Sequence, residues 1–106
     1  MKKRLHRLAG RELALLLGLL AGATAQAGDL QARVVSSAGE PKPFVRVEVS
    51  GPARQTLFTD RDGRLSAMGL PGGSYLVQVS EGYRRMDFRI QVPQRGEVNR
   101  TFELKW

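Results

Sequence analysis

Apolar and polar side chains alternate along most of the chain after residue 27, and this alternation predicts β-strands. The clearest case is Phe44–Ser50, in which every second residue is a valine. Ser74–Ser80 and Arg84–Val92 follow the same rule. A period of two residues is typical of a strand that buries one face and exposes the other. No helical period is seen after residue 27.

Turn residues divide this region into about seven short strands at nearly regular spacing. They are expected at residues 30–36, 44–50, 55–59, 64–67, 74–80, 84–92 and 97–105. Short strands at such spacing favour a sandwich of two antiparallel sheets. The predicted core consists of the apolar residues on one parity: Val34, Val45, Val47, Val49, Leu65, Tyr75, Val77 and Val79.

Two of the turns have a specific chemistry. Asp60–Gly63 suits a tight hairpin, because Asp side chains cap their own turn and Gly63 can take a positive φ. Leu70–Gly73 is a second turn, in which proline sets φ and glycine permits the reversal.

Asp60 and Asp62 also resemble part of a calcium-binding loop. Such a loop needs further ligands at its first and twelfth positions. The alignment places Phe58 and Gly69 there, and neither side chain can bind calcium. The turn is therefore the favoured interpretation, and no metal site is predicted.

The first 27 residues have the layout of a secretory signal peptide. Five basic residues precede or border an apolar stretch of 11 residues, Leu13–Ala23, and Ala25–Ala27 is a small-x-small cleavage site. A membrane-spanning helix needs ~20 residues, so the stretch is too short for a stable anchor. We expect cleavage after Ala27, one mature domain at residues 28–106, and a location in the periplasm or outside the cell.

Charge and composition exclude several functions. The chain has 17 basic and 10 acidic residues, but removal of the predicted signal peptide leaves 12 and 9. Nucleic-acid binding needs a basic stripe or a known motif, and neither is seen. The single histidine, His6, lies in the signal segment, and there is no cysteine. Because general acid–base catalysis near neutral pH most often uses histidine, we expect no enzyme activity and no cofactor.

Several motifs occur in an order that resembles a known family. They are Val34–Pro41, Val45–Val49, Thr59–Leu65, Gly69–Tyr75 and Gly82–Tyr83. Together they resemble the carboxypeptidase regulatory-like domain, over nearly all of residues 29–106. The resemblance implies an all-β, seven-stranded antiparallel Greek-key β-sandwich of the prealbumin-like (transthyretin-like) or immunoglobulin-like type, related to starch-binding-like folds.

The family resemblance says little about function, because one sandwich fold can perform many unrelated roles. Such domains are usually appended to a metallocarboxypeptidase, an outer-membrane transporter or a cell-surface protein. Here the domain is expected to stand alone after a signal peptide. The chain has no zinc-peptidase motif, so the name of the family does not imply peptidase activity.

Five exposed positions form the candidate interaction surface. Phe44, Phe58 and Leu76 have the parity opposite to the core, whereas Tyr83 lies in a turn and Trp106 ends the chain. Clustering of the first three would favour a protein interface. A groove lined by Tyr83 and Trp106 would favour stacking on sugar.

The leading hypothesis is a non-catalytic binding or accessory module that meets an envelope protein through a sheet face or an edge strand. Carbohydrate (polysaccharide) binding is the first alternative, and a structural envelope subunit is the second. A set of arginines is expected on solvated outer faces, with an anionic-ligand face as the alternative: Arg46, Arg84, Arg85, Arg89 and Arg100.

Overall fold

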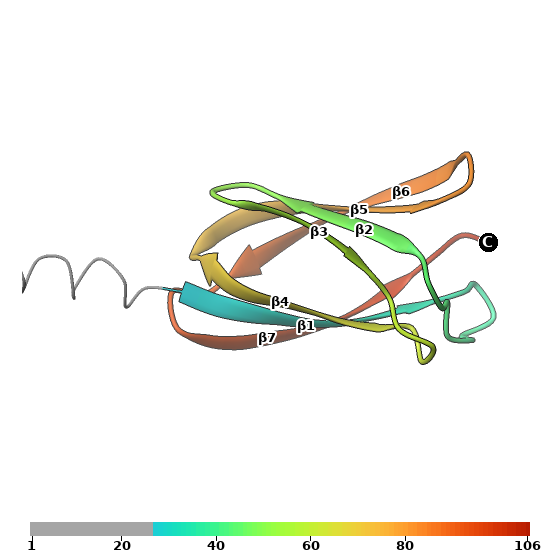
Figure 1. Ribbon diagram of the computed structural model, residues 1–106, viewed down its shortest axis with the longest axis horizontal. Helices are drawn as coiled ribbons and strands as arrows, with labels where there is room; N and C mark the ends of the chain where they lie inside the picture. Colours follow the sequence, from blue (N-terminus) through green and yellow to red (C-terminus); the bar gives the residue numbers. More distant parts are fainter. Residues whose placement is uncertain (1–26) are drawn as a thin grey trace, which may run out of the picture.

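The computed structural model describes residues 27–106 as a sandwich of two β-sheets (Figure 1). The strands are β1 (Ala27–Val35), β2 (Arg46–Ser50), β3 (Arg54–Phe58), β4 (Arg64–Pro71), β5 (Gly73–Glu81), β6 (Arg84–Val92) and β7 (Gly96–Glu103). This confirms the predicted all-β, seven-stranded sandwich. The predicted signal peptide lies outside the described residues, except for Ala27. The described part of the chain has no helix that is long and apolar enough to cross a membrane.

The sheets have the strand orders β4-β1-β7 and β3-β2-β5-β6. After β3 and β4, strand β5 returns to lie beside β2, which is a Greek-key connection. One pairing corrects the expectation of antiparallel sheets, because β1 and β7 run parallel. The reason is that β7 arrives from the other sheet at the end where β1 begins, and Gly96 is paired with Gly28.

Both predicted turns join strands of different sheets. At Asp60–Gly63 the turn forms as expected, with Gly63 N donating to Asp60 O at 3.0 Å. Its strands β3 and β4 then separate into the two sheets instead of forming a paired hairpin. At Leu70–Gly73 the reversal is shorter than predicted, because β4 continues to Pro71 in register with β1, and only Gly72 separates it from β5.

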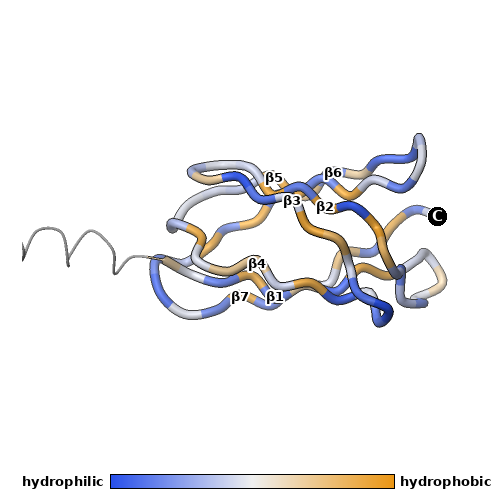
Figure 2. The backbone as a smooth tube through the Cα atoms, in the orientation of Figure 1, coloured by the Kyte–Doolittle hydropathy of each residue, from blue (hydrophilic) through white to orange (hydrophobic). Residues whose placement is uncertain are grey.

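The core lies between the two sheets, where the apolar segments of the chain face each other (Figure 2). All eight residues predicted for the core are buried. The other buried apolar residues are Leu30, Ala32, Val35, Ala67, Leu70, Ile90, Val92, Phe102 and Leu104. The rings of Phe88 and Phe102 meet across the sandwich with their centroids 4.7 Å apart, which adds a tilted aromatic contact between β6 and β7.

Thr59 is a buried polar residue that ties the β1–β2 connection to the end of β3. Its hydroxyl accepts a hydrogen bond from Val45 N at 2.9 Å and donates one to Lys42 O at 2.6 Å. The hydroxyl therefore satisfies two backbone groups that have no strand partner at this point, which fixes the end of the sandwich where Phe44 lies.

Candidate functional site

Phe58 ends the edge strand of the four-stranded sheet, and the backbone of Phe44 lies close to this end. Phe44 N donates to Thr59 O at 3.0 Å, so Phe44 lies beside the residue that follows Phe58. The two side chains are 72% and 63% exposed. Phe44 has a φ of 56° and is the one non-glycine residue with positive φ in residues 27–106. A bulky residue in this conformation is uncommon, and such backbone geometry occurs often at functional positions.

The edge strand β3 carries little charge compared with the edge strand at the other side of its sheet. Arg54, its first residue, is the one charged residue of β3. Strand β6 carries Arg84, Arg85, Asp87 and Arg89. Charges on an edge strand oppose pairing with other chains. The edge at β3 is therefore the more open of the two to a partner strand.

A cleft separates the edges of β3 and β4, which face each other without pairing. It has a volume of about 470 Å³, and its lining includes Thr56, Phe58 and Arg64. The side chain of Gln55 bridges the two edges farther along, because its Nε2 donates to Met68 O at 2.8 Å. Phe58 is thus both an exposed side chain and one wall of this cleft.

Leu76 does not join the two phenylalanines. In the register of the sheet it lies opposite Ser50 and Arg89, whereas Phe58 lies opposite Arg46, four residues away along β2. Leu76 lines a separate cavity together with Arg89 and Arg100. Phe44, Phe58 and Leu76 therefore do not form one cluster, because Leu76 lies apart from Phe58.

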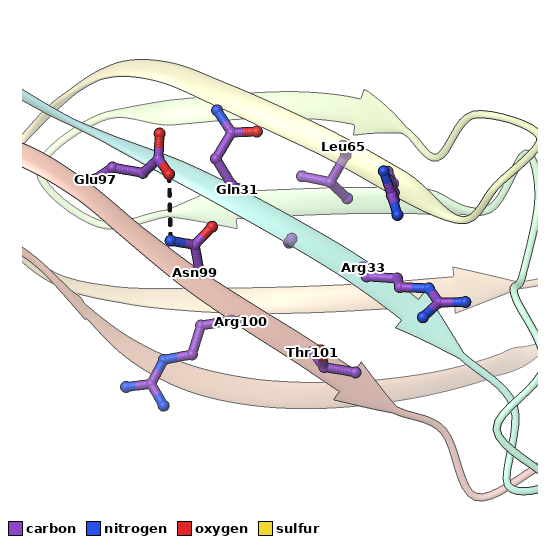
Figure 3. A pocket seen from close by; sticks show the side chains of 9 residues that line it. Gln31, Arg33, Leu65, Glu97, Asn99, Arg100 and Thr101 are labelled. Carbon is purple, nitrogen blue, oxygen red and sulfur yellow. Dashed lines mark hydrogen bonds between the residues drawn. The ribbon is translucent and has the colours of Figure 1, made fainter.

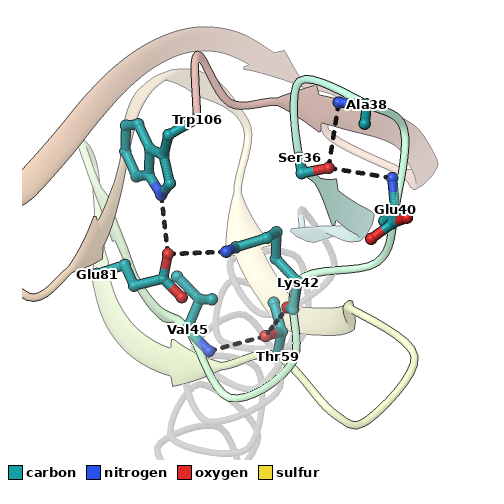
Figure 4. Close-up of polar contacts among 8 residues, drawn as sticks. All are labelled: Ser36, Ala38, Glu40, Lys42, Val45, Thr59, Glu81 and Trp106. Atoms are coloured by element: carbon teal, nitrogen blue, oxygen red, sulfur yellow. Dashed lines mark hydrogen bonds and ion pairs between the residues drawn. The ribbon is translucent and has the colours of Figure 1, made fainter.

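Trp106 is bound into a network of polar contacts at the end of the sandwich (Figure 4). Its Nε1 donates to Glu81 Oε1 at 2.8 Å, and the same oxygen lies 2.9 Å from Lys42 Nζ. The guanidinium of Arg84 lies 5.9 Å from the centroid of the indole ring. The ring also packs against the core. These contacts give Trp106 a structural role at the end of β7.

Tyr83 directly precedes Arg84, whose guanidinium lies near the ring of Trp106. Tyr83 lies in the β5–β6 turn, with 94% of its side chain exposed. The indole N–H is already used by Glu81, and one part of the ring faces the core. The indole N–H of Trp106 is therefore used within the protein, and only part of its ring is open to a sugar.

The network at Trp106 makes part of the stability depend on pH. Hydrogen bonds from Lys42 and Trp106 lower the pKa of Glu81 below its usual value of 4.5. A carboxylate with a lowered pKa stabilises the fold above the pKa of the unfolded chain, and this contribution is lost as the pH falls through the folded pKa. We expect Glu81→Gln to lower the unfolding midpoint by about 1–4 °C at pH 7. The difference from wild type should shrink toward zero as the pH falls below 4.5.

Thermal unfolding of the two proteins between pH 7 and pH 3 measures this effect. Trp106→Phe is a matched control, because it keeps a ring against the core and removes the indole N–H. It should weaken the dependence on pH in part. A difference between wild type and Glu81→Gln that stays constant over this range would contradict the assignment.

Asp60 acts as the cap of its own turn. One carboxylate oxygen accepts hydrogen bonds from Asp62 N at 2.8 Å and Arg64 N at 2.9 Å. The bond from Arg64 is the main cause of the lowered pKa of Asp60. These bonds confirm the turn interpretation. In the part of the chain that the structure describes, no group of three or more His, Cys, Asp or Glu side chains could hold a metal ion.

A second surface lies on the outer face of the three-stranded sheet (Figure 3). A shallow cavity of about 480 Å³ is lined there by polar side chains from β1, β4 and β7. Arg33 and Arg64 are direct partners in the β1–β4 register, and Thr101 is the partner of Arg33 on β7. Sequence reasoning missed these three residues, because the register between distant strands that brings them together leaves no signal in any one strand.

The fold and these surfaces define a small prealbumin-like β-sandwich domain with exposed polar and aromatic positions. The chain belongs to the carboxypeptidase regulatory-like domain family, whose model matches residues 29–105. No curated protein matches the sequence.

Three solved structures share the fold. The TIE protein of Bacillus anthracis aligns with 23% identity and a TM-score of 0.63 over 76% of this chain and 16% of its own. The minor pilin GBS52 of Streptococcus agalactiae aligns with 21% identity and a TM-score of 0.64 over 77% and 45%. A "putative carbohydrate binding protein" of Bacteroides uniformis aligns with 14% identity and a TM-score of 0.58 over 74% and 41%. This chain thus spans less than half the length of each structure.

Proposed function

We propose that this chain is an exported, non-catalytic binding module that meets an envelope protein through the edge at β3. Export rests on the layout of residues 1–27. Ala27 is the exposed first residue of β1, so cleavage after it would shorten that strand by one residue. The proposal of a non-catalytic role rests on the lack of histidine after His6, since proteins of one fold can be catalytic or not.

One observation carries the protein-binding role: the exposed Phe58 ends a nearly uncharged edge strand, and the backbone of the exposed Phe44 lies beside the next residue, Thr59. Within residues 27–106, β3 pairs with β2 alone, and its other side faces β4 across the cleft without strand pairing. An added strand would enter this cleft at the end near Phe58, away from the Gln55 bridge. Phe44 and Phe58 would supply apolar contact beside that strand. Aromatic side chains at such positions often contribute most of the binding energy of an interface.

A photo-crosslinking experiment tests this role. A benzoylphenylalanine replaces Phe58 in the full chain, which is produced and exported in its own cells. The control carries the same group in place of Arg85, which is exposed on β6, the edge strand at the opposite side of the sheet. We expect irradiation to give one adduct with an envelope protein from position 58 and none from position 85. The recovered chain should begin at Gly28.

Two results would count against the proposal. No adduct from position 58 above the unirradiated sample would exclude a stable partner at this edge. The same adducts from both positions would indicate collisions with abundant proteins and no specific interface.

Carbohydrate binding is the second candidate function, and the polar outer face of β4-β1-β7 favours it. Gln31, Ser66 and Asn99 lie in one row across this sheet and present amide and hydroxyl groups. Groups of this kind bind sugar hydroxyls through hydrogen bonds. The similar Bacteroides uniformis structure is called a "putative carbohydrate binding protein", which agrees with such a role, although the likeness itself is one of fold.

A further inference from the structure

Two arginines face the same side of the three-stranded sheet as direct cross-strand partners. Arg33 on β1 is paired with Arg64 on β4, and both are exposed. Side chains of directly opposed residues start from Cβ atoms only ~5 Å apart, and like charges in this position destabilise a sheet. The pair therefore opposes folding unless something compensates its charge.

The described residues supply no such compensation by ion pairing. Neither guanidinium takes part in an ion pair within residues 27–106. Asp60, which precedes Arg64 in the chain, uses one carboxylate oxygen to cap its turn. The carboxylate of Glu97 accepts a bond from Asn99, farther along β7. Asp60 still attracts Arg64 electrostatically, which is one cause of the lowered pKa of Asp60, but no carboxylate of the described residues forms an ion pair with either arginine. Two neighbouring arginines of this kind present donors that match a carboxylate or phosphate.

The groups beside the arginine pair are neutral and polar. Thr101 lies next to Arg33 on β7, and its side chain is exposed. In the adjacent row, Ser66 Oγ donates to Gln31 Oε1 at 2.6 Å, and Asn99 is the partner of Gln31 on β7. Along the strands the face thus changes from cationic to neutral hydrogen-bonding groups, and then to the acidic row of Asp29 and Glu97. This order suits a ligand that carries an acidic group and hydroxyls on neighbouring atoms.

We propose that this face binds an acidic polysaccharide, with Arg33 and Arg64 on a sugar carboxylate and the row of Gln31, Ser66 and Asn99 on its hydroxyls. The inference rests on the second candidate function and is independent of the protein-binding edge. An anionic membrane is the less suitable occupant, because the row of Gln31, Ser66 and Asn99 beside the arginines offers neutral groups that suit sugar hydroxyls.

Affinity electrophoresis of the mature domain tests the proposal, in gels that contain polygalacturonate or neutral dextran. The test variant is Arg33→Gln with Arg64→Gln. The control is Arg89→Gln with Arg95→Gln, which removes the same charge from exposed positions on β6 and in the β6–β7 turn. We expect wild type to be retarded by polygalacturonate and not by dextran. The test variant should bind about tenfold more weakly, which is ~1.4 kcal/mol, and the control should bind as wild type does.

Thermal unfolding gives an independent check that the test variant is folded. Because the substitutions remove a like-charge pair, its unfolding midpoint should equal or exceed that of wild type. A lower midpoint would show that the arginines are compensated within the protein, and would overturn the argument from charge.

The outcomes separate this inference from the function on which it rests. Equal retardation by dextran and polygalacturonate would keep carbohydrate binding and overturn the anionic site. If both double variants bound polygalacturonate equally weakly, the attraction would depend on net charge alone, and this result would also overturn the anionic site. Binding to phosphatidylglycerol vesicles without retardation by polygalacturonate would assign the pair to a membrane surface. No retardation by either polymer would reject both the inference and the carbohydrate candidate.

Discussion

Val47→Asp should abolish the cooperative unfolding transition of the domain. Val47 is fully buried in β2, between Leu57 of β3 and Val79 of β5. A carboxylate at this position would have no cation or hydrogen-bond donor of its own, and an unpaired buried charge costs several kcal/mol. A domain of this length has a free energy of unfolding of only ~4–12 kcal/mol. The substitution therefore removes most or all of the stability.

Circular dichroism during heating measures this effect, and Ser80→Asp is the matched control. Ser80 lies next to Val79 on the solvent side of the same sheet, with Arg46 and Arg85 as its cross-strand partners. A carboxylate there meets two cations and should leave the midpoint unchanged or slightly raised. If Val47→Asp kept a transition within a few degrees of wild type, the assignment of its face would be wrong.

The facing of Val47 could be predicted because one strand contains all the information needed. Each strand with one buried face repeats every two residues, so the valines of β2 and β5 identify the core without knowledge of their neighbours. A turn can be predicted for the same reason, because the residues that form it are neighbours in the sequence. Asp60 and Gly63 predicted the turn and its capping, and the structure confirms both.

Pairing between distant strands could not be predicted in this way. The parallel β1–β7 pair depends on where the chain re-enters the three-stranded sheet, and no residue of β7 encodes that direction alone. The separation of β3 from β4 after a hairpin-like turn has the same origin. A local turn sets the reversal of the chain, whereas the burial of apolar faces decides which sheet each strand joins.

The candidate sites also show this difference between local patterns and pairing of distant strands. Parity correctly placed Phe44 and Phe58 on the exposed side, but it could not show that Leu76 lies in another part of the sheet. Trp106 was open to two interpretations until its bond to Glu81, 25 residues earlier, was known. The Arg33–Arg64 pair could not be predicted from the sequence of β1 or of β4 alone, because each arginine by itself has the pattern of an ordinary solvated residue.

Gly63→Ala should strongly destabilise the domain, although it adds only one methyl group. Gly63 has a φ of +74°, where an L-residue costs ~1–2 kcal/mol. It is also buried, and a Cβ there would lie 2.6 Å from Val34 O and 3.0 Å from Lys42 N. Because Val34 O accepts the hydrogen bond of Lys42 N at 2.9 Å, the methyl group would force apart β1 and the β1–β2 connection. We expect a loss of about 2–4 kcal/mol.

Gly39→Ala separates the two causes of this loss. Gly39 has a φ of +82°, and a Cβ there would meet nothing within 4 Å. It should therefore show the backbone strain alone, at ~1–2 kcal/mol. Urea denaturation of both variants gives the comparison, with equal m-values as the sign that both remain two-state. Equal losses would mean that the contact of Gly63 with β1 relaxes at no cost. A larger loss for Gly63→Ala would establish that the Asp-Gly turn is held against β1, which makes it part of the sandwich and more than a surface reversal.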